Sequence, residues 1–418
     1  MRVLLICPVF PPEYAPAGIM TQELAADLCI AGHEVRVMTG WPNHPEGRLF
    51  PGFRRRLVKR ERSNSFELLR VWHSLPGEKS FCERIAYWMT FSVSCFFAIC
   101  FGKGYDVIYS QTVPLTGPFL VFLASWIRGA RFVYGIFDIY PEAALEAHVV
   151  KPGLLFKFAR CLDTWVCRRA SRIRVIGEAQ KTTLLRRGVP ERKISVIPLW
   201  LDESRVRSGS RSLSFRKANG IGADMTVVLY AGTIGKISGA GLVLDVARKM
   251  KGEPSVLFLF VGEGVLKKQL AQRAVNERLS NVRFLPFQAE DRLGDMFTSA
   301  DIGLVTLLSG AGRNSVPSKV LGYLAAGLPV VASADLDCDV AQYLRKGRCG
   351  RVCPAQDAVA LSNALRELLD PPVRAQAADS ALSVFRQHFS RAAGTAGCIH
   401  LLAGVHNEGL DYASGTAH

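Results

Sequence analysis

Three short segments in the second half of the chain combine glycine, serine and lysine in a way that suits an anion. The first is the turn GTIGK at residues 232–236, which lies between an apolar run at 227–230 and a helical pattern. A strand–turn–helix unit of this kind offers free N–H groups and a positive dipole end to a phosphate. Lys236 adds a full charge. The alternative is an ordinary βα turn that needs glycine for its geometry, and this stretch alone favours neither.

Two more strand-to-helix turns in the same half repeat the pattern. GEG at 262–264 follows the apolar run 258–261 directly, and SVPSK at 315–319 opens a predicted helix at 319–326. Because the carboxyl ends of parallel strands meet at one edge of a sheet, the three turns belong to one surface. Each turn is a weak signal alone. Together, in a chain of formal charge +16, they indicate a site for a nucleotide diphosphate.

In the first half, an acid and a glycine stand at comparable places. Asp138 follows the apolar run 131–137 and precedes a turn, so it is well placed for chemistry at the strand's carboxyl end. The alternative is a turn or N-cap aspartate. The proline-rich loop 8–18 ends at Gly18, just before a helix pattern at 19–31. Both positions predict ligand contacts in the first half.

The elements that must hold these residues alternate between strands and helices throughout. We expect an α/β protein with two doubly wound domains, because short apolar runs alternate with helical periods in both halves. A break rich in Ser, Arg and Gly separates the halves. The expected division is a first domain at 1–202, a linker at 203–222, a second domain at 223–370, and a C-terminal helix and tail at 371–418.

The composition is that of a folded protein with an anionic partner. Hydrophobic residues make up 49% and charged residues 21%, which argues against disorder. Lys plus Arg is 52 and Asp plus Glu is 36, so the charge excess calls for a phosphorylated ligand, an acidic membrane or nucleic acid. The eleven cysteines form no C-x-x-C pair, so we expect reduced thiols, no zinc and a cytoplasmic protein without a signal peptide.

Two neighbouring segments of the first half bear on membranes. Six of the nine residues at 54–62 are basic. This run suits contact with anionic lipid or a solvated face. It suits nucleic acid less well, because it lacks interleaved aromatic residues. Residues 85–102 contain no charge and reach the lower limit for a spanning helix. Because the βα pattern continues on both sides, we favour a helix packed on the sheet or lying in the membrane interface over a span.

Longer motifs give the chain a family resemblance. It resembles the GT-B glycosyltransferases of family 4, the retaining group, and among them the enzymes of bacterial exopolysaccharide, O-antigen and colanic acid assembly. The resemblance covers nearly the whole chain. The motifs that carry it are PPEYAPAG (11–18), AGHEVRVMTGWPNHPEG (31–47), FDIYPE (137–142), VIGEAQKTTLLRRGVPERKISVIPLW (175–200), VLYAGTIGK (228–236), FLFVGEG (258–264) and SVPSKVLGYLAAGLPVVAS (315–333).

The resemblance implies two Rossmann-like domains that face each other across a cleft, with specific roles for the residues above. The second domain would bind the nucleotide sugar and the first the acceptor. Lys236 would hold the diphosphate, and Asp138 would polarise the acceptor hydroxyl or hold the sugar. No metal and no cofactor are implied. The residues expected around the donor are Gly18, Gly232, Thr233, Gly235, Glu263, Gly264, Ser318 and Lys319.

Four positions depart from the pattern of the family. Thr233 stands where many relatives have an arginine, so Lys236 carries more of the charge. Asn314 and Gly322 stand where relatives have two glutamates, the second of which usually holds the ribose. A histidine common in the first domain is missing from 131–137.

The sequence therefore predicts a retaining glycosyltransferase, hexosyl or N-acetylhexosaminyl in type. It would move a sugar from a nucleotide-diphosphate donor, a UDP-sugar for preference, to a lipid-linked saccharide in surface polysaccharide synthesis. The protein would attach to the anionic inner face of the cytoplasmic membrane, with no nucleic acid as partner. The alternatives are a sugar-nucleotide 2-epimerase of the same fold and a catalytically weakened scaffold.

Overall fold

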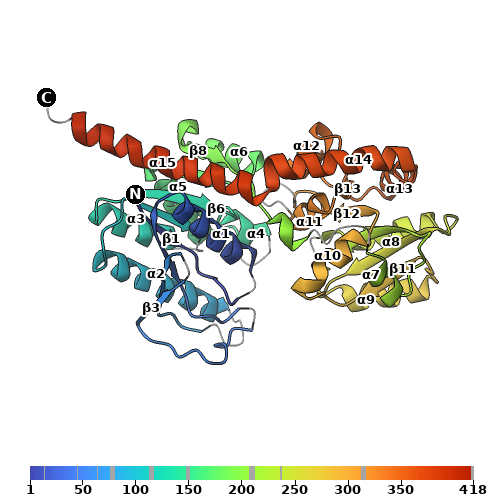
Figure 1. The fold of residues 1–418 in the computed structure, drawn as a ribbon, viewed down its shortest axis with the longest axis horizontal. Coiled ribbons are helices and arrows are strands. Elements are labelled where there is room, and N and C mark those ends of the chain that lie inside the picture. The colour runs from blue at the N-terminus through green and yellow to red at the C-terminus, as the bar shows by residue number, and fades with distance from the viewer. Residues whose placement is uncertain are drawn as a thin grey trace. The chain divides into compact units, whose positions relative to one another are not determined.

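The fold is taken from a computed structural model (Figure 1). It describes residues 1–13, 15–44, 46–63, 65–75, 81–112, 117–146, 151–206, 212–235, 238–311 and 317–415. The chain forms two compact units. The first unit comprises Met1–Ile197 together with Thr395–His418, and the second comprises Pro198–Gly394.

The first unit is built on an eight-stranded sheet of order β3-β4-β2-β1-β5-β6-β7-β8. All neighbours are parallel except β3 and β4. The chain winds outward from β1 in both directions, so the switch point lies between β1 and β5. The strands are β1 (Arg2–Ile6), β2 (Glu34–Thr39), β3 (Val58–Arg62), β4 (Glu67–Val71), β5 (Val107–Gln111), β6 (Arg131–Ile136), β7 (Arg172–Val175) and β8 (Ile194–Val196).

Helices cover this sheet because its central strands are apolar on both faces. The described helices are α1 (Pro16–Ile30), α2 (Phe81–Cys100), α3 (Gly117–Ile127), α4 (Glu142–Glu146), α5 (Leu154–Arg169) and α6 (Glu178–Arg186), with the 3₁₀ turn η1 (Glu191–Lys193). On one face Leu4, Ile6 and Ile108 share a core with side chains of α2, α3 and α5. Burial of such side chains is worth about 1.5–3 kcal/mol each, so this layer stabilises the unit.

The charge-free segment 85–102 forms most of α2, and its apolar character serves packing. Tyr87, Phe91, Cys95 and Ile99, at spacing four, are all buried. This is the face of a helix on a sheet. No described helix combines the length and the apolarity that a membrane crossing requires. The structure agrees with the first of the two predicted placements, a helix packed on the sheet.

The second unit contains a six-stranded, wholly parallel sheet of order β11-β10-β9-β12-β13-β14. Its strands are β9 (Thr226–Ala231), β10 (Val256–Val261), β11 (Val282–Leu285), β12 (Ile302–Thr306), β13 (Val330–Ser333) and β14 (Gly350–Cys353). Its other elements are η2 (Glu203–Arg205), α7 (Leu213–Ala218), α8 (Gly241–Lys249), α9 (Lys267–Asn276), α10 (Glu290–Thr298), α11 (Lys319–Ala325), α12 (Asp339–Lys346), α13 (Ala358–Glu367), α14 (Pro371–Val384) and the π-helical turn η4 (Phe385–Phe389).

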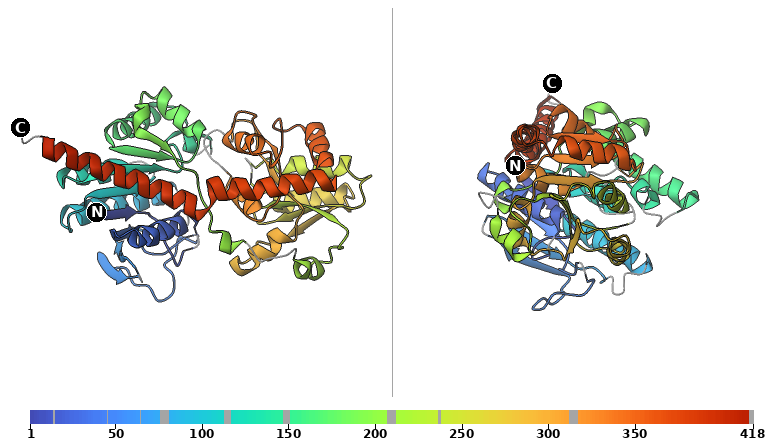
Figure 2. Two further views of the ribbon diagram at one scale, coloured as in Figure 1. Left: turned by 45° about the horizontal axis from the view of Figure 1, so that its top comes forward. Right: turned by 90° about the vertical axis from the view of Figure 1, so that its right-hand side faces the viewer.

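Both faces of the second sheet are buried. Val227 and Leu229 of β9 belong to a core shared with α10, α11 and α14, whereas Val228 and Tyr230 belong to a core shared with α8, α9 and α13. Figure 2 shows helices on both sides of the sheet. The expectation of two doubly wound α/β units is confirmed.

The predicted boundaries need correction. The division falls between Ile197 and Pro198 rather than after residue 202, and the described part of the predicted linker belongs to the second unit. Arg216 of α7 explains this, because its buried guanidinium pairs with Asp301 at 2.6 Å. At the other end, helix α15 (Arg391–Gly415) begins in the second unit and continues into the first.

Three strands were missed in the sequence. β3 is VKRER and largely exposed, so it shows no apolar alternation. β4 follows it closely, and the pair forms an antiparallel edge. β14 has only four residues, GRVC. The basic segment 54–62 therefore ends in an edge strand, where charged side chains are common because they prevent edge-to-edge pairing.

Candidate active site

The turns after β9 and β10 are joined into one surface by their backbones. The N–H of Gly232 donates to the carbonyl of Val261 at 2.9 Å, and the N–H of Ile234 donates to the carbonyl of Glu263 at 2.9 Å. The two predicted anion turns thus continue the pairing of their strands beyond the sheet. The structure brings them together as expected.

This backbone contact gives glycine at 262 and 264 a specific reason. A Cβ at residue 262 would lie 2.0 Å from the carbonyl oxygen of Gly232, and one at 264 would lie 2.4 Å from that of Ile234. Gly262 also has φ of +149°, in a region that side chains disfavour. Both glycines are therefore required by the neighbouring turn, whatever ligand the turns bind.

Lys319, at the start of α11 and the last residue of the third predicted turn, lies at the same place. Its Nζ lies 3.7 Å from the centroid of the Tyr230 ring. Its Cε lies 3.7 Å from the position of a Cβ at residue 232. No carboxylate in the described ranges pairs with this ammonium. Burial lowers the pKa of Lys319 to about 7, because a desolvated ammonium without a counter-ion is disfavoured.

Two tyrosines that the sequence analysis missed hold this arrangement. The hydroxyl of Tyr230 donates to the carbonyl of Thr233 at 3.2 Å. The hydroxyl of Tyr323, one turn along α11 from Lys319, accepts from the N–H of Ala231 at 2.7 Å and donates to the carbonyl of Leu304 at 3.3 Å. Tyr323 thereby fixes the first turn of α11 against β9 and β12. The spacing of four residues between Lys319 and Tyr323 was the sequence signal that could have identified Tyr323.

The other residues of this unit that are predicted to bind the sugar donor differ in exposure and in their contacts. Thr233 and Ser318 are exposed, and Gly235 accepts a hydrogen bond from Ser238 at 2.7 Å. Glu263 is also exposed, and its carboxylate pairs with Lys267 of α9 at 2.6 Å, which lowers the pKa of Glu263. Lys236 lies outside the described residues, so its role stays a prediction.

Residue 322, where relatives have the glutamate that usually holds the ribose, is a glycine packed against a phenylalanine ring. A Cβ at residue 322 would lie 2.5 Å from Cζ of Phe297. Gly322 is buried on α11, and the Phe297 ring packs edge-on against Tyr323. A side chain at 322 would therefore enter the core. Asn314, the other departure, lies outside the part of the chain that the structure describes.

In the first unit, Asp138 follows β6 on a tightly held loop. The N–H of Phe137 donates to Oγ1 of Thr112 at 3.1 Å, and Nε2 of Gln180 donates to the carbonyl of Phe137 at 2.9 Å. Partial burial raises the pKa of Asp138. Within the described ranges no hydrogen bond or ion pair reaches its carboxylate. An unpaired, partly desolvated acid at a strand's carboxyl end is suited to accept a proton.

Gly18 has a structural role of its own. A Cβ at residue 18 would lie 2.5 Å from the carbonyl oxygen of Val9, so glycine lets α1 begin directly against the loop after β1. The close approach is to the chain's own backbone. Contact between Gly18 and a donor stays a prediction.

The buried carboxylate of Glu13, which the sequence analysis missed, organises the loops beside Gly18. Its Oε1 accepts from the N–H groups of Asn43 and His44, each at 2.7 Å, and its Oε2 accepts from Phe10 at 3.1 Å. Burial raises the pKa of Glu13. Glu13 thus ties the loops after β1 and β2 together at the edge where Asp138 also lies.

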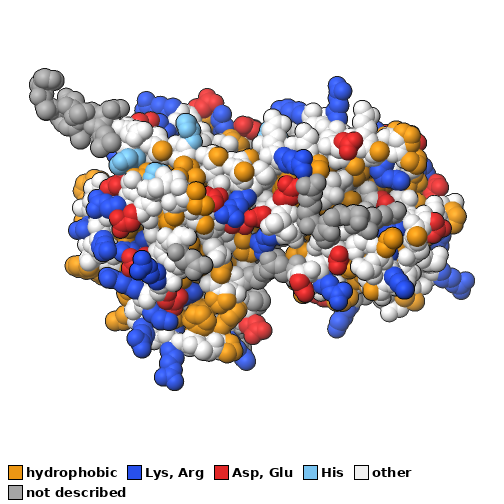
Figure 3. All heavy atoms as spheres, in the orientation of Figure 1, with side chains coloured by type: hydrophobic (Ala, Val, Ile, Leu, Met, Phe, Trp, Pro, Cys, Tyr) orange, Lys and Arg blue, Asp and Glu red, His pale blue; other side chains and the backbone are white. Residues whose placement is uncertain are grey.

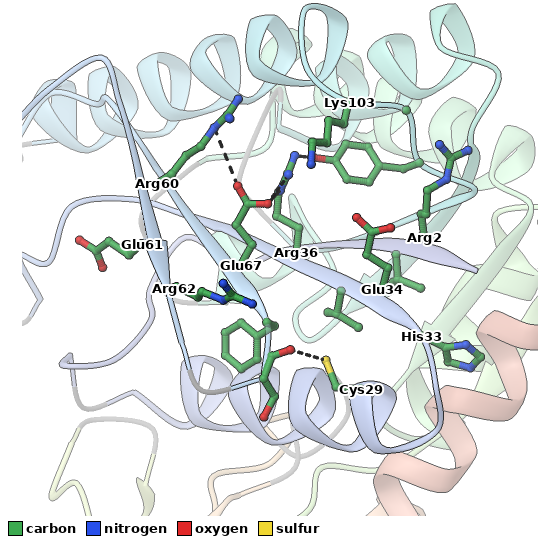
Figure 4. A pocket seen from close by; sticks show the side chains of 16 residues that line it. Arg2, Cys29, His33, Glu34, Arg36, Arg60, Glu61, Arg62, Glu67 and Lys103 are labelled. Atoms are coloured by element: carbon green, nitrogen blue, oxygen red, sulfur yellow. Dashed lines mark hydrogen bonds and ion pairs between the residues drawn. The ribbon is translucent and has the colours of Figure 1, made fainter.

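A large hollow of about 920 Å³ lies elsewhere, at the opposite edge of the first sheet. Figure 4 shows Arg36 directed at Glu67 and at the hydroxyl of Tyr105, at the amino ends of β2 and β4. Arg2 pairs with Asp106 at 2.8 Å. Because its buried charges are satisfied and Asp138 is at the other edge, this hollow is not the candidate site.

Among the described residues, no group of three His, Cys, Asp or Glu side chains is arranged to hold a metal ion.

Two family models match the chain and together cover most of it. Residues 225–371 match "Glycosyl transferases group 1", and residues 17–200 match "Glycosyl transferase 4-like domain". The chain belongs to the family 4 glycosyltransferases. The matched ranges contain both the turns of the second unit and Asp138.

Relatives agree with this assignment. The chain is 26% identical over 381 residues to WcaI of Escherichia coli, named as a colanic acid biosynthesis glycosyl transferase, covering 88% of this chain and 92% of WcaI. It is 25% identical over 273 residues to the glycosyltransferase WbjE of Pseudomonas aeruginosa, covering 63% and 66%. The predicted family is confirmed, and the protein is a glycosyltransferase of bacterial polysaccharide biosynthesis.

A solved structure agrees on the fold. The crystal structure of Anabaena HepE in complex with UDP and glucose superposes with a TM-score of 0.67 at 16% identity, covering 96% of this chain and 99% of HepE. At this identity the likeness concerns the fold, which is the GT-B fold of two Rossmann-like units.

Proposed function

We propose that this glycosyltransferase takes its sugar from a UDP-sugar held at the β9, β10 and α11 edge of the second unit. The ammonium of Lys319, which has no carboxylate partner among the described residues and lies beside the Gly232 turn, carries the proposal. A cation that burial has driven to a pKa of about 7 gains most from an anion placed next to it. UDP is the favoured nucleotide because HepE, which shares the fold, holds UDP.

The ammonium of Lys319 would also stabilise the nucleotide as it leaves the sugar. As the glycosidic bond to the donor breaks, negative charge grows on the β-phosphate, and fixed cations and N–H donors stabilise that charge. Lys319 and the predicted Lys236 would supply the charge without a metal, and no cofactor is needed. Phosphate binding would restore the proton of Lys319, so the cation would be fully formed only with the donor bound.

The acceptor would be activated from the first unit. Asp138, with its raised pKa and with no bond to its carboxylate from the described residues, would accept the proton of the acceptor hydroxyl or hold the transferred sugar. We propose transfer with retention, of a hexosyl or N-acetylhexosaminyl group, onto a lipid-linked saccharide. Such an acceptor would keep the protein at the inner face of the cytoplasmic membrane as a peripheral, cytoplasmic enzyme, in a pathway such as O-antigen or exopolysaccharide assembly.

The test is turnover of a panel of UDP-sugars with a membrane extract as acceptor. Acceptor-dependent release of free UDP, together with labelled sugar in the lipid fraction, would support the proposal. An epimerase would return an altered UDP-sugar without free UDP. A scaffold would bind no nucleotide. Either of the last two results contradicts the proposed transfer.

A further inference from the structure

Helix α5 of the first unit lies between two hollows that the proposed reaction does not use. One, of about 500 Å³, lies between α5 and α6 and is here called the basic hollow. Its lining includes the cations Lys157, Arg160, Arg168, Arg169, Arg186 and Arg187, and none of the described residues that line it is acidic. Figure 3 shows Lys and Arg alongside Asp and Glu over the face turned to the viewer. In the basic hollow, the charged residues among the described lining are all cations.

Only part of this charge is neutralised. The buried guanidinium of Arg187 pairs with Asp163 at 2.6 Å and with Glu142, and its Nε has no hydrogen-bond partner. Arg160 also reaches Glu142, at 3.5 Å. No acid among the described residues pairs with the other four cations of the hollow. The basic hollow thus holds four cations without an acidic partner among the described residues, which suits a phosphate group.

The second hollow, here called the apolar trough, adjoins the first between α3 and α5. It measures about 720 Å³ and is lined by rings that include Phe122, Trp126, Phe132 and Trp165. Trp165 and Arg169 line both hollows, and the Arg169 guanidinium lies 4.1 Å from the Trp165 ring centroid. A phosphate site and an apolar trough thus share a wall, which is the layout that an anionic lipid requires.

Exposed apolar side chains extend this surface at both ends. Leu154, Leu155 and Phe158 in the first turns of α5 are 86%, 69% and 64% exposed, and Trp126 and Ile127 at the end of α3 are 71% and 53% exposed. Exposed Lys157 and Arg160 are interleaved with them on α5. Large apolar groups among cations are typical of segments that insert into an anionic interface.

We infer that the surface formed by α3, α5 and α6 is the membrane-docking face of the protein. The basic hollow takes the phosphate of an anionic phospholipid headgroup, and the exposed residues of α5 enter the acyl boundary. This inference rests on the proposed function, whose acceptor is lipid-linked. It replaces segment 54–62 as the contact. Because α5 leads from the carboxyl end of β6 back to β7, its apolar first turns lie at the sheet edge of Asp138. The apolar trough lies at the amino ends of β6 and β7, so the docking face runs along α5 from one edge of the sheet to the other.

The test is sedimentation of the full chain with vesicles of phosphatidylcholine, with and without phosphatidylglycerol. The double variant Lys157→Gln/Arg186→Gln should bind the anionic vesicles about 25-fold more weakly at low salt, from about five-fold per cation. Its matched control is Arg54→Gln/Arg62→Gln, which removes the same charge from the predicted basic segment and should bind like wild type. Equal binding by the first variant, or loss in the control alone, overturns the inference.

A second pair of variants tests the apolar contact. Leu155→Ser/Phe158→Ser should lower vesicle binding by about ten-fold or more, whereas Val275→Ser/Val359→Ser, at two exposed positions of the second unit, should not. No vesicle binding by wild type would contradict docking. Inorganic phosphate that raises Tm through Lys157 and Arg186, without a vesicle effect, would instead indicate a soluble ligand and also contradict docking.

Titration with UDP separates this inference from the proposed function. All four variants should bind UDP like wild type, because none alters the second unit's turns. Normal UDP binding without vesicle binding overturns the docking face alone. Vesicle binding without UDP binding overturns the donor assignment and leaves the docking face standing.

Discussion

The ammonium of Lys319 lies 3.7 Å from the centre of the Tyr230 ring. Tyr230 is one of the last residues of β9 and Lys319 is the first residue of α11, so the contact joins the end of this strand to the start of this helix. A cation over an aromatic face gains about 0.5–2 kcal/mol, less than a full counter-ion provides. The arrangement holds Lys319 in place while leaving its charge available to a ligand.

Nucleotide binding should therefore depend on pH through Lys319. Its pKa of about 7 in the folded chain, against roughly 10.4 when unfolded, means that the free protein loses this proton as pH rises above 7. We expect UDP affinity to fall between pH 7 and 9, with proton uptake on binding. Calorimetry at pH 8 in two buffers of different ionisation enthalpy measures the uptake. The variant Lys319→Met should show none at this site, and equal uptake in both proteins contradicts the assignment.

The same pKa affects stability, and the sign follows from proton counting. Between pH 7 and about 10.4 the unfolded chain holds more protons at Lys319 than the folded chain, so this group's contribution to the free energy of unfolding rises with pH. In denaturant titrations from pH 7 to 9, wild type should gain stability relative to Lys319→Met. The opposite trend would show that Lys319 is not desolvated.

Gly262→Ala should destabilise the second unit by about 1–3 kcal/mol, since the new methyl would meet the carbonyl of Gly232 and the backbone is in a region reserved for glycine. UDP binding should weaken as well, because the paired turns would separate. Gly252→Ala is the matched control, since a Cβ there meets nothing within 4 Å. Denaturant unfolding checks both, and equal stability of the two variants would exclude the close contact.

Gly322→Glu should not restore a ribose contact. The new side chain would meet Phe297, and a charge in that core costs about 3–5 kcal/mol. We expect a lower Tm and no gain in UDP affinity. Gly404→Glu, on an open part of α15, should fold like wild type. Tighter UDP binding by Gly322→Glu at unchanged Tm would show that residue 322 reaches the ligand.

Asp138→Asn should lower turnover by roughly 10²–10⁴-fold if the carboxylate takes the acceptor's proton. Its backbone contacts remain, so Tm should hold and UDP should bind normally. Steady-state rates with the acceptor, beside a UDP titration, separate these effects. Turnover within a few-fold of wild type would remove Asp138 from the chemistry.

The sequence was most informative where local rules apply. Apolar runs identified most of the parallel strands, and the glycines of the turns identified the edge where they meet. The contact of Lys319 with Tyr230 was not predictable, because it depends on which strands become neighbours in the sheet. β3 was missed for a related reason, since an edge strand needs no apolar alternation.

The position of Gly322 shows a different limit. A motif comparison identifies an absent glutamate but not what fills its place, and the Phe297 ring on α10 does so. Likewise, the domain boundary depends on the long-range pair of Arg216 and Asp301, which the polar composition of 203–222 conceals.

The most direct test of the donor site is calorimetric titration of UDP into wild type, Lys319→Met and Lys268→Met. Lys268 is an exposed lysine of α9 and serves as the control. Loss of a charge-assisted contact of about 1.5–3 kcal/mol predicts binding roughly 10- to 100-fold weaker for Lys319→Met, with Lys268→Met unchanged. Equal UDP affinity in all three proteins, or no binding by wild type, would contradict a donor site built around Lys319.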